Sequence, residues 1–140
     1  MTNIQEQLIG TWKLRTYQDV AEDGTIYYPL GKDATGFIMY NPDGYMSAQL
    51  MQQGRPSYAS GDLHKGTTEE MATAAEGYVA YSGKFKIDEA NATLYHTMDV
   101  SMNPTWLGNT QPREYTLEDN VLTLVNGNNR NQKLIWDRVK

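Results

Sequence analysis

Hydrophobic and polar residues alternate along most of this chain, with the period of two that is typical of half-buried β-strands. In residues 10–20, Trp12, Leu14 and Val20 share the face predicted to be buried, whereas Asp19 falls on the polar face. The same alternation predicts further strands at residues 25–30, 34–40, 45–51, 78–87, 93–101, 111–118, 121–125 and 134–139. The chain is therefore predicted to consist mainly of strands.

The segments between these strands carry turn and helix signals. Residues 41–44 read Asn-Pro-Asp-Gly, with proline second and glycine last, which predicts a hairpin turn. Thr67 precedes Glu70 by three residues, the spacing of a capping box, so a single helix is predicted to follow and to end at Gly77. Residues 3–9 are predicted to form a short helical or irregular lead-in.

Tight turns join most of the strands, so consecutive strands should pair in an up-and-down meander that removes its free edges by closing on itself. The first and last strands would meet if Arg138 lays its guanidinium over the Trp12 ring. Gly10 stands at the start of the first strand, where a Cβ would obstruct a tight bend of the chain. We predict an all-β fold, a closed barrel of eight or nine strands with one short helix, in which residues 1–140 form a single domain.

The two ends of such a barrel need covers. Leu8 and Ile9 in the lead-in are apolar and are predicted to plug one end. Residues 52–77 are the long interruption in a chain of tight turns, and we expect this loop and helix to act as a lid over the other mouth.

Charge and composition narrow the function. The net charge is −5 and the basic residues are scattered, which argues against binding to a phosphate backbone. No apolar run approaches the roughly 20 residues of a membrane-spanning helix, and the first residues do not resemble a signal peptide. The chain has no cysteine and only two histidines, so we expect a cytoplasmic protein without a metal site or a cofactor.

The ten tyrosines and seven methionines, against two phenylalanines, are an unusual way to fill an interior. Tyrosine adds bulk with a hydroxyl that needs a partner, and methionine fills irregular space, so both suit a cavity that holds a ligand. A tyrosine-rich outer surface explains the composition equally well.

Two residues are the main candidates for a site inside the barrel. The alternation places His96 and Arg113 on inner faces of strands that should pair. A buried arginine is costly without a counter-charge, so with His96 it could receive a carboxylate, an enolate or a phenolate. The alternative is that Arg113 lies near the barrel mouth and pairs with Glu114 or Asp99 in solvent.

Other side chains could complete the wall of the cavity. The pattern predicts Tyr81, Tyr115 and Met98 on inner faces, and Trp106 in a loop where it could stack on a ligand. The strand at residues 45–51 can present either of its faces, and the face with Gln49 is favoured because it offers the cavity a polar group. For the two tyrosines and Trp106, packing without a ligand is the alternative.

Several stretches resemble a family of small bacterial and fungal lipocalin-like domain proteins, relatives of the calycins. In addition to Gly10-Thr11-Trp12 and Arg138, the matching segments are residues 8–12, 28–31, 36–40, 43–49, 77–81 and 134–139. This resemblance covers nearly the whole chain and implies a closed barrel with an interior pocket, the fold of a small-molecule carrier. A fold alone does not assign a substrate or a reaction.

The sequence therefore predicts a barrel that binds a small hydrophobic molecule with an anionic or carbonyl end. The alternative is an isomerase, cyclase or dehydratase that uses the same cavity, with His96 or a tyrosine as acid or base. A barrel kept for structural contacts would have a filled interior. The sequence leaves open the ligand, the choice between carrier and enzyme, and the oligomeric state.

Overall fold

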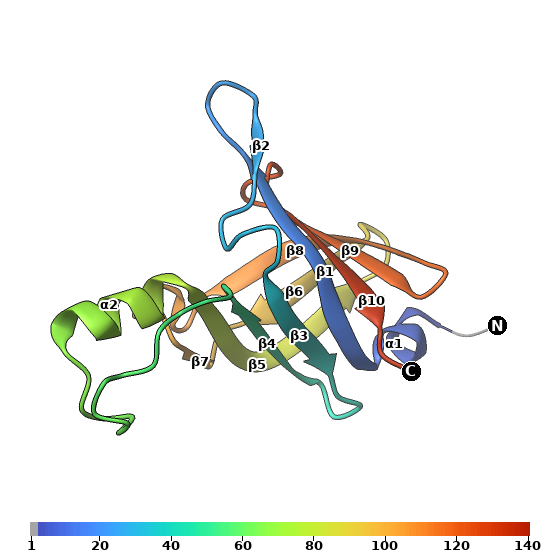
Figure 1. Ribbon diagram of the computed structural model, residues 1–140. Coiled ribbons are helices and arrows are strands. Elements are labelled where there is room, and N and C mark those ends of the chain that lie inside the picture. Colours follow the sequence, from blue (N-terminus) through green and yellow to red (C-terminus); the bar gives the residue numbers. More distant parts are fainter. Residues whose placement is uncertain (1–2) are drawn as a thin grey trace.

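The computed structural model describes residues 3–140, and strands are its main secondary structure (Figure 1). Its elements are α1 (Ile4–Leu8), β1 (Gly10–Val20), β2 (Ile26–Tyr27), β3 (Thr35–Tyr40), β4 (Tyr45–Met51), α2 (Thr68–Glu76), β5 (Tyr78–Asp88), β6 (Thr93–Thr97), β7 (Val100–Ser101), the 3₁₀ helix η1 (Pro104–Trp106), β8 (Thr110–Glu118), β9 (Val121–Asn126) and β10 (Lys133–Arg138). The predicted hairpin turn at residues 41–44 and the capping box of Thr67 and Glu70 are both present.

Eight strands form a closed antiparallel barrel. Its order is β10-β9-β8-β6-β5-β4-β3-β1, and β1 pairs with β10 to complete the ring. The remaining two strands, β2 and β7, pair with β1 and β5 outside this path. The predicted closed meander of eight or nine strands is therefore confirmed.

The end of the barrel near both termini is closed by α1 and by the contact between the first and last strands. Trp12 stands directly opposite Arg138, whose guanidinium lies 4.2 Å from the centre of the indole ring. The indole nitrogen of Trp12 donates to the carbonyl of Leu8 at 2.9 Å, which ties α1 to the barrel. Gly10 has φ +133°, a conformation that glycine adopts without the strain that a Cβ would add. The predicted contact of Trp12 with Arg138 and the predicted plug at residues 8–9 are both present.

A β-bulge changes the faces of β1. The register with β10 shifts between Leu14 and Thr16, so the residues beyond the bulge exchange their inner and outer positions. Asp19 is consequently buried at 8% exposure, and Tyr17 packs against the core. The expectation that Val20 faces the core and Asp19 faces solvent is wrong, because strict alternation fails after the bulge.

The strand predicted at residues 93–101 is two elements. After Met98 the chain leaves β6, and the backbone of Asp99 donates to Ser82 on β5. The next residues form β7, in which Val100 is 62% exposed rather than inside the barrel. Gly83 permits this crossing, since a Cβ there would lie 1.8 Å from the carbonyl oxygen of Thr97.

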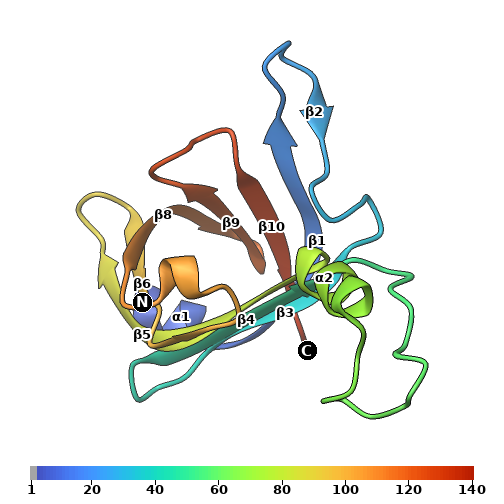
Figure 2. The ribbon, with the colours of Figure 1, turned by 90° about the vertical axis from the view of Figure 1, so that its left-hand side faces the viewer.

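The loop and helix at residues 52–77 lie beside the barrel mouth, where Ala75 and Glu76 line a cavity, and the role of this segment as a lid stays a prediction. Figure 2 looks along the barrel from the end opposite α1 and shows α2 beside the rim, while η1 lies in front of the ring of strands. None of the residues of α2 is buried. No helix within residues 3–140 has the length and apolar character required to span a membrane. The cytoplasmic location stays a prediction.

Replacing Arg138 with alanine should lower the free energy of unfolding by about 1–2 kcal/mol, because it removes the cation–π contact and the packing of the side chain. The guanidinium also donates to the carbonyls of Gln7 and Ile9, so α1 should loosen. Urea denaturation measures the change. As a control, Arg15→Ala removes an exposed partner of Asp137 and should cost less. Equal losses in the two variants would contradict the closing role of Arg138.

Candidate functional site

Two adjoining cavities lie at the end of the barrel away from α1. The inner cavity has a volume of about 60 Å³ and is lined by Tyr17, Leu50, Val79, Tyr81, Trp106, Arg113, Asn126, Gln132 and Leu134. The outer cavity has a volume of about 320 Å³ and is lined by the last turn of α2, by the start of β5 and by residues 101–103. Tyr17, Val79, Trp106 and Gln132 line both. A small molecule could therefore extend from one into the other.

Arg113 is a buried cation without an anionic partner. It is 5% exposed, and no carboxylate within residues 3–140 lies within 4.0 Å of its nitrogens. One nitrogen, Nη1, donates to the carbonyl of Pro112 at 2.9 Å. The guanidinium also lies 5.7 Å from the ring centre of Trp106. The alternative that Arg113 pairs with Glu114 in solvent is wrong, since Glu114 bonds to the exposed Arg130 at 2.9 Å.

His96 is completely buried between two tyrosines. Its Nε2 shares a hydrogen bond of 2.8 Å with the hydroxyl of Tyr40, and its Nδ1 shares one of 3.2 Å with Tyr81. A neutral imidazole has one donor and one acceptor, so one tyrosine donates to His96 and the other accepts. Burial, and secondly the charge of Arg113, lower the pKa of His96 to about 3. His96 is therefore neutral at physiological pH.

The tyrosines around His96 are neutral as well. Burial raises the pKa of Tyr40 well above its ordinary value. Burial also raises the pKa of Tyr81, although the nearby charge of Arg113 opposes this rise. Because Tyr81 lines the inner cavity and His96 does not, the histidine reaches the cavity only through the Tyr81 hydroxyl.

Sequence reasoning missed a polar group at the rim of the inner cavity. The Asn126 side chain donates to Gln132 at 2.7 Å, and Gln132 donates to the Asp19 carboxylate at 3.3 Å. Tyr17 lies beside them, and its pKa is raised by burial first and by Asp19 second. The bulge brings Tyr17 and Asp19 inward, and no residue pattern in the strand marks it. The alternation within 121–126 could have placed Asn126 on the inner face.

Trp106 is the aromatic side chain of η1. Its ring meets Tyr81 edge to face with ring centres 5.7 Å apart, and it also covers the guanidinium of Arg113. It is the side chain of the 102–109 loop that lines both cavities. The predicted stacking of Trp106 on a ligand stays a prediction, but its position between the two cavities suits that role.

The other candidates from the sequence lie outside these cavities. Gln49 is exposed and lines a groove on the outer surface of β3 and β4, so its predicted inward orientation is wrong. The strand turns Met46, Ala48 and Leu50 inward instead, because this face supplies apolar bulk to the core. Tyr115 and Met98 do not line either cavity.

Tyr115 and Met98 lie in other parts of the barrel. Tyr115 lies near the turn after β5, where burial, Glu89 and Asp88 raise its pKa. Met98 is fully buried, and its backbone bonds to Gly108 and Asn109 at the base of the η1 loop.

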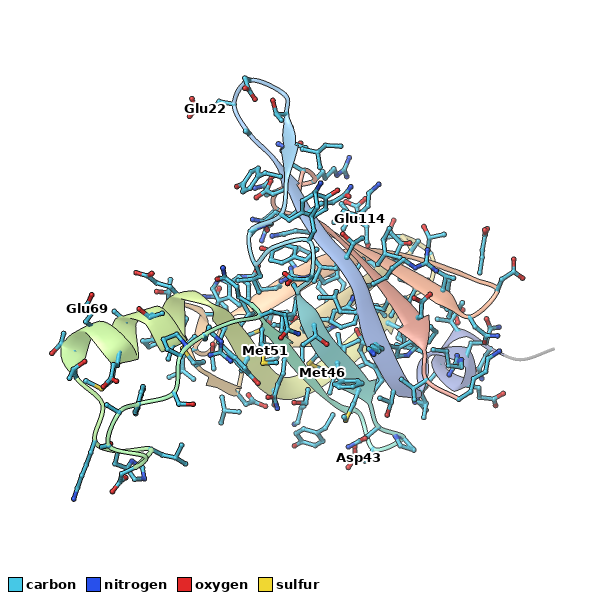
Figure 3. All side chains as sticks on the ribbon, in the orientation of Figure 1. Glu22, Asp43, Met46, Met51, Glu69 and Glu114 are labelled. Atoms are coloured by element: carbon cyan, nitrogen blue, oxygen red, sulfur yellow. The ribbon has the colours of Figure 1, made fainter. Side chains whose placement is uncertain are left out.

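Carboxylates are kept to the outside of the molecule, apart from Asp19. Figure 3 shows Glu22 in the turn between β1 and β2, Asp43 in the β3–β4 turn and Glu69 on α2, all at the periphery. Among residues 3–140, no three His, Cys, Asp or Glu side chains gather where they could hold a metal ion. The polar groups that line the cavities are one guanidinium, tyrosine and serine hydroxyls and amides, together with the Glu76 carboxylate at the outer cavity.

Comparison with known proteins relates residues 9–139 to a family described as a lipocalin-like domain. A 4'-hydroxy-3'-methoxypropiophenone carrier protein of Aspergillus oryzae is 35% identical over 85 residues, which cover 56% of this chain and 77% of that protein.

Two solved structures share the fold. A lipocalin-like protein from Bacteroides uniformis has a TM-score of 0.55 at 18% identity, over 95% of this chain and 99% of that one. An uncharacterized protein from Bacteroides eggerthii has a TM-score of 0.50 at 15% identity, over 94% of this chain and 99% of the other. At these identities the likeness shows the fold alone.

The lowered pKa of His96 predicts a dependence of stability on pH. The folded protein keeps His96 neutral down to about pH 3, whereas the unfolded chain binds a proton near the ordinary value of 6.5. Stability from this group is therefore present above pH 6.5 and is lost as the pH falls toward 3. We expect the free energy of unfolding to fall by about 2 kcal/mol between pH 7 and pH 5 from His96 alone, at about 1.4 kcal/mol per pKa unit.

Urea denaturation at the two pH values measures this loss. His96→Gln should remove it, whereas His64→Gln, a change in an exposed loop, should leave it unchanged. A loss of full size that persists in His96→Gln would contradict the assignment to His96.

Proposed function

Because this chain belongs to the family of lipocalin-like domains, we propose that its barrel binds a small hydrophobic molecule with a carbonyl or anionic end. The oxygen of the ligand lies in the inner cavity against Arg113, and its apolar body occupies the outer cavity. The observation that carries the proposal is a buried guanidinium that has no carboxylate partner among residues 3–140, at the end of a mostly apolar cavity. Such a cation binds an oxygen acceptor more strongly than an exposed one.

The sizes of the cavities support this orientation. About 60 Å³ is the volume of roughly two water molecules, so the inner cavity suits one polar group rather than a whole ligand. The outer cavity of about 320 Å³ falls within the range of small-molecule sites. Trp106 borders both volumes, where it contacts the ligand between its polar end and its body.

The name of the Aspergillus oryzae relative supports a ligand of this kind. Its 4'-hydroxy-3'-methoxypropiophenone is a small aromatic ketone with a phenolic hydroxyl at the opposite end. We propose an aromatic molecule with a ketone or an acidic hydroxyl as the ligand of this chain. The side-chain amides of Asn126 and Gln132, which line the inner cavity, offer hydrogen-bonding groups to a hydroxyl at its rim.

A carrier is better supported than an enzyme. Both ring nitrogens of His96 are bonded to tyrosines, and the ring does not reach the cavity, so it is poorly placed as a general base. Proton abstraction requires a base within hydrogen-bonding reach of the substrate. The hydroxyl of Tyr81 instead suits a positioning role, in which it bonds the same oxygen that Arg113 holds.

The test is the binding of 4'-hydroxy-3'-methoxypropiophenone, followed by tryptophan fluorescence. Arg113→Met should weaken binding by about 10–100-fold, because a hydrogen bond to a charged group contributes about 1.5–3 kcal/mol and each 1.4 kcal/mol is tenfold. Arg130→Met is the matched control, since it removes the same charge from an exposed turn.

Equal binding by the two variants would contradict the site, and an absence of binding by the wild type would contradict this choice of ligand. A carrier should return the ketone chemically unchanged after prolonged incubation. A product with a new retention time or a new mass that disappears with His96→Gln would instead indicate the enzymatic alternative.

A further inference from the structure

We infer that the Arg113 end of the inner cavity binds an acidic phenol as its phenolate, so that the barrel ionises its ligand on binding. This inference rests on the proposed function, because it concerns the same cavity. In the step, the ligand O–H bond breaks, its proton leaves to solvent, and the phenolate oxygen accepts hydrogen bonds from the guanidinium. No oxidant, reductant or second substrate takes part.

The first support is the charge of the cavity wall. Arg113 is 5% exposed and lacks a carboxylate partner among residues 3–140, so its charge is desolvated before a ligand arrives. An isolated buried cation is costly, and an anion that enters relieves this cost. A neutral ligand leaves the cost in place. The cavity is therefore selective for the anionic form.

The second support is that the tyrosines and the histidine facing Arg113 do not compensate its charge. From β5, β6, β1 and β3, the side chains of Tyr81, His96, Tyr17 and Tyr40 interact with it electrostatically. All four are neutral near pH 7, because burial raises the tyrosine pKa values and lowers that of His96 to about 3. Of the four, Tyr17 and Tyr81 line the inner cavity and can donate hydrogen bonds to an anion, and none of the four competes for the guanidinium.

The carboxylates of Asp19 and Glu114 have other partners, and Glu76, which lines the outer cavity, is exposed to solvent. Asp19 on β1 accepts hydrogen bonds from the backbone of Val20, from Tyr27 and from Gln132. On β8 itself, Glu114 bonds to Arg130 at the surface. A guanidinium has five N–H donors, and Nη1 of Arg113 donates to the carbonyl of Pro112. The N–H groups of Nε and Nη2 are therefore available to a ligand.

Two opposing effects decide the protonation state of the ligand. Burial in an apolar cavity favours the neutral phenol, whereas a cation within about 4–6 Å lowers the pKa of an acid by roughly 1–3 units. Because Arg113 is already buried, its pairing with a phenolate gives both desolvated charges a counter-charge. The anion is therefore favoured. The aromatic rings of Tyr17 and Trp106 line both cavities and suit the flat body of a phenol.

The experiment uses para-nitrophenol, whose anion absorbs visible light and whose neutral form does not. Its absorbance is titrated against pH with and without an excess of the full-length protein. We expect the midpoint to move down by at least about one pH unit, which corresponds to tenfold tighter binding of the phenolate than of the phenol. Arg113→Met should abolish the shift, and Arg130→Met should retain it.

Para-nitroanisole, the methyl ether that cannot ionise, separates this inference from the proposed function. Its equal binding to wild type and Arg113→Met shows that the variant keeps its fold and its cavity. If the ether binds and the midpoint for para-nitrophenol stays in place or rises, the ionisation is disproved while the hydrophobic site stands. A shift of the same size in Arg113→Met also disproves it. If the wild type binds neither compound, both the inference and the site are wrong.

Discussion

Closure of the sheet by the pairing of β1 with β10 is the constraint on which the rest of this structure depends. It removes the two free edges, and it fixes Trp12 opposite Arg138 so that one end of the barrel is filled by an indole, a guanidinium and the short helix α1. With that end filled, empty volume inside the ring collects at the opposite end. The position of the cavities is thus a consequence of the way in which the barrel closes.

The polar end of the cavity combines one charge with several neutral hydrogen-bonding groups. His96 is held between two tyrosine hydroxyls and does not line the cavity, and Tyr81 connects it to Arg113. The bond to His96 orients the Tyr81 hydroxyl, and the full burial of His96 keeps its ring from exchanging partners with water. The proposed carrier would benefit from such an arrangement, because the groups proposed to receive the ligand are ordered before it binds.

The sequence predicted the barrel because period-two alternation and turn residues are local signals that can be read from neighbouring positions. It also placed His96, Tyr81 and Arg113 on inner faces, since β5, β6 and β8 keep a regular pleat around these residues. It failed at β1, where a bulge reverses the faces of Tyr17 and Asp19, and at β4, where Gln49 points outward. A bulge depends on the partner strand, and the face of β4 depends on what the core must fill, so neither is a property of the strand alone.

The bulge in β1 also divides this strand into two parts with different structural roles. Residues before it serve closure, as Trp12 does, and residues after it, such as Tyr17, serve the cavity. The shift in register lies between them, so the residues that line the cavity are separate from those that make the closing contact. Substitutions in the cavity half can therefore change what the cavity accepts while the contact of Trp12 with Arg138 stays the same.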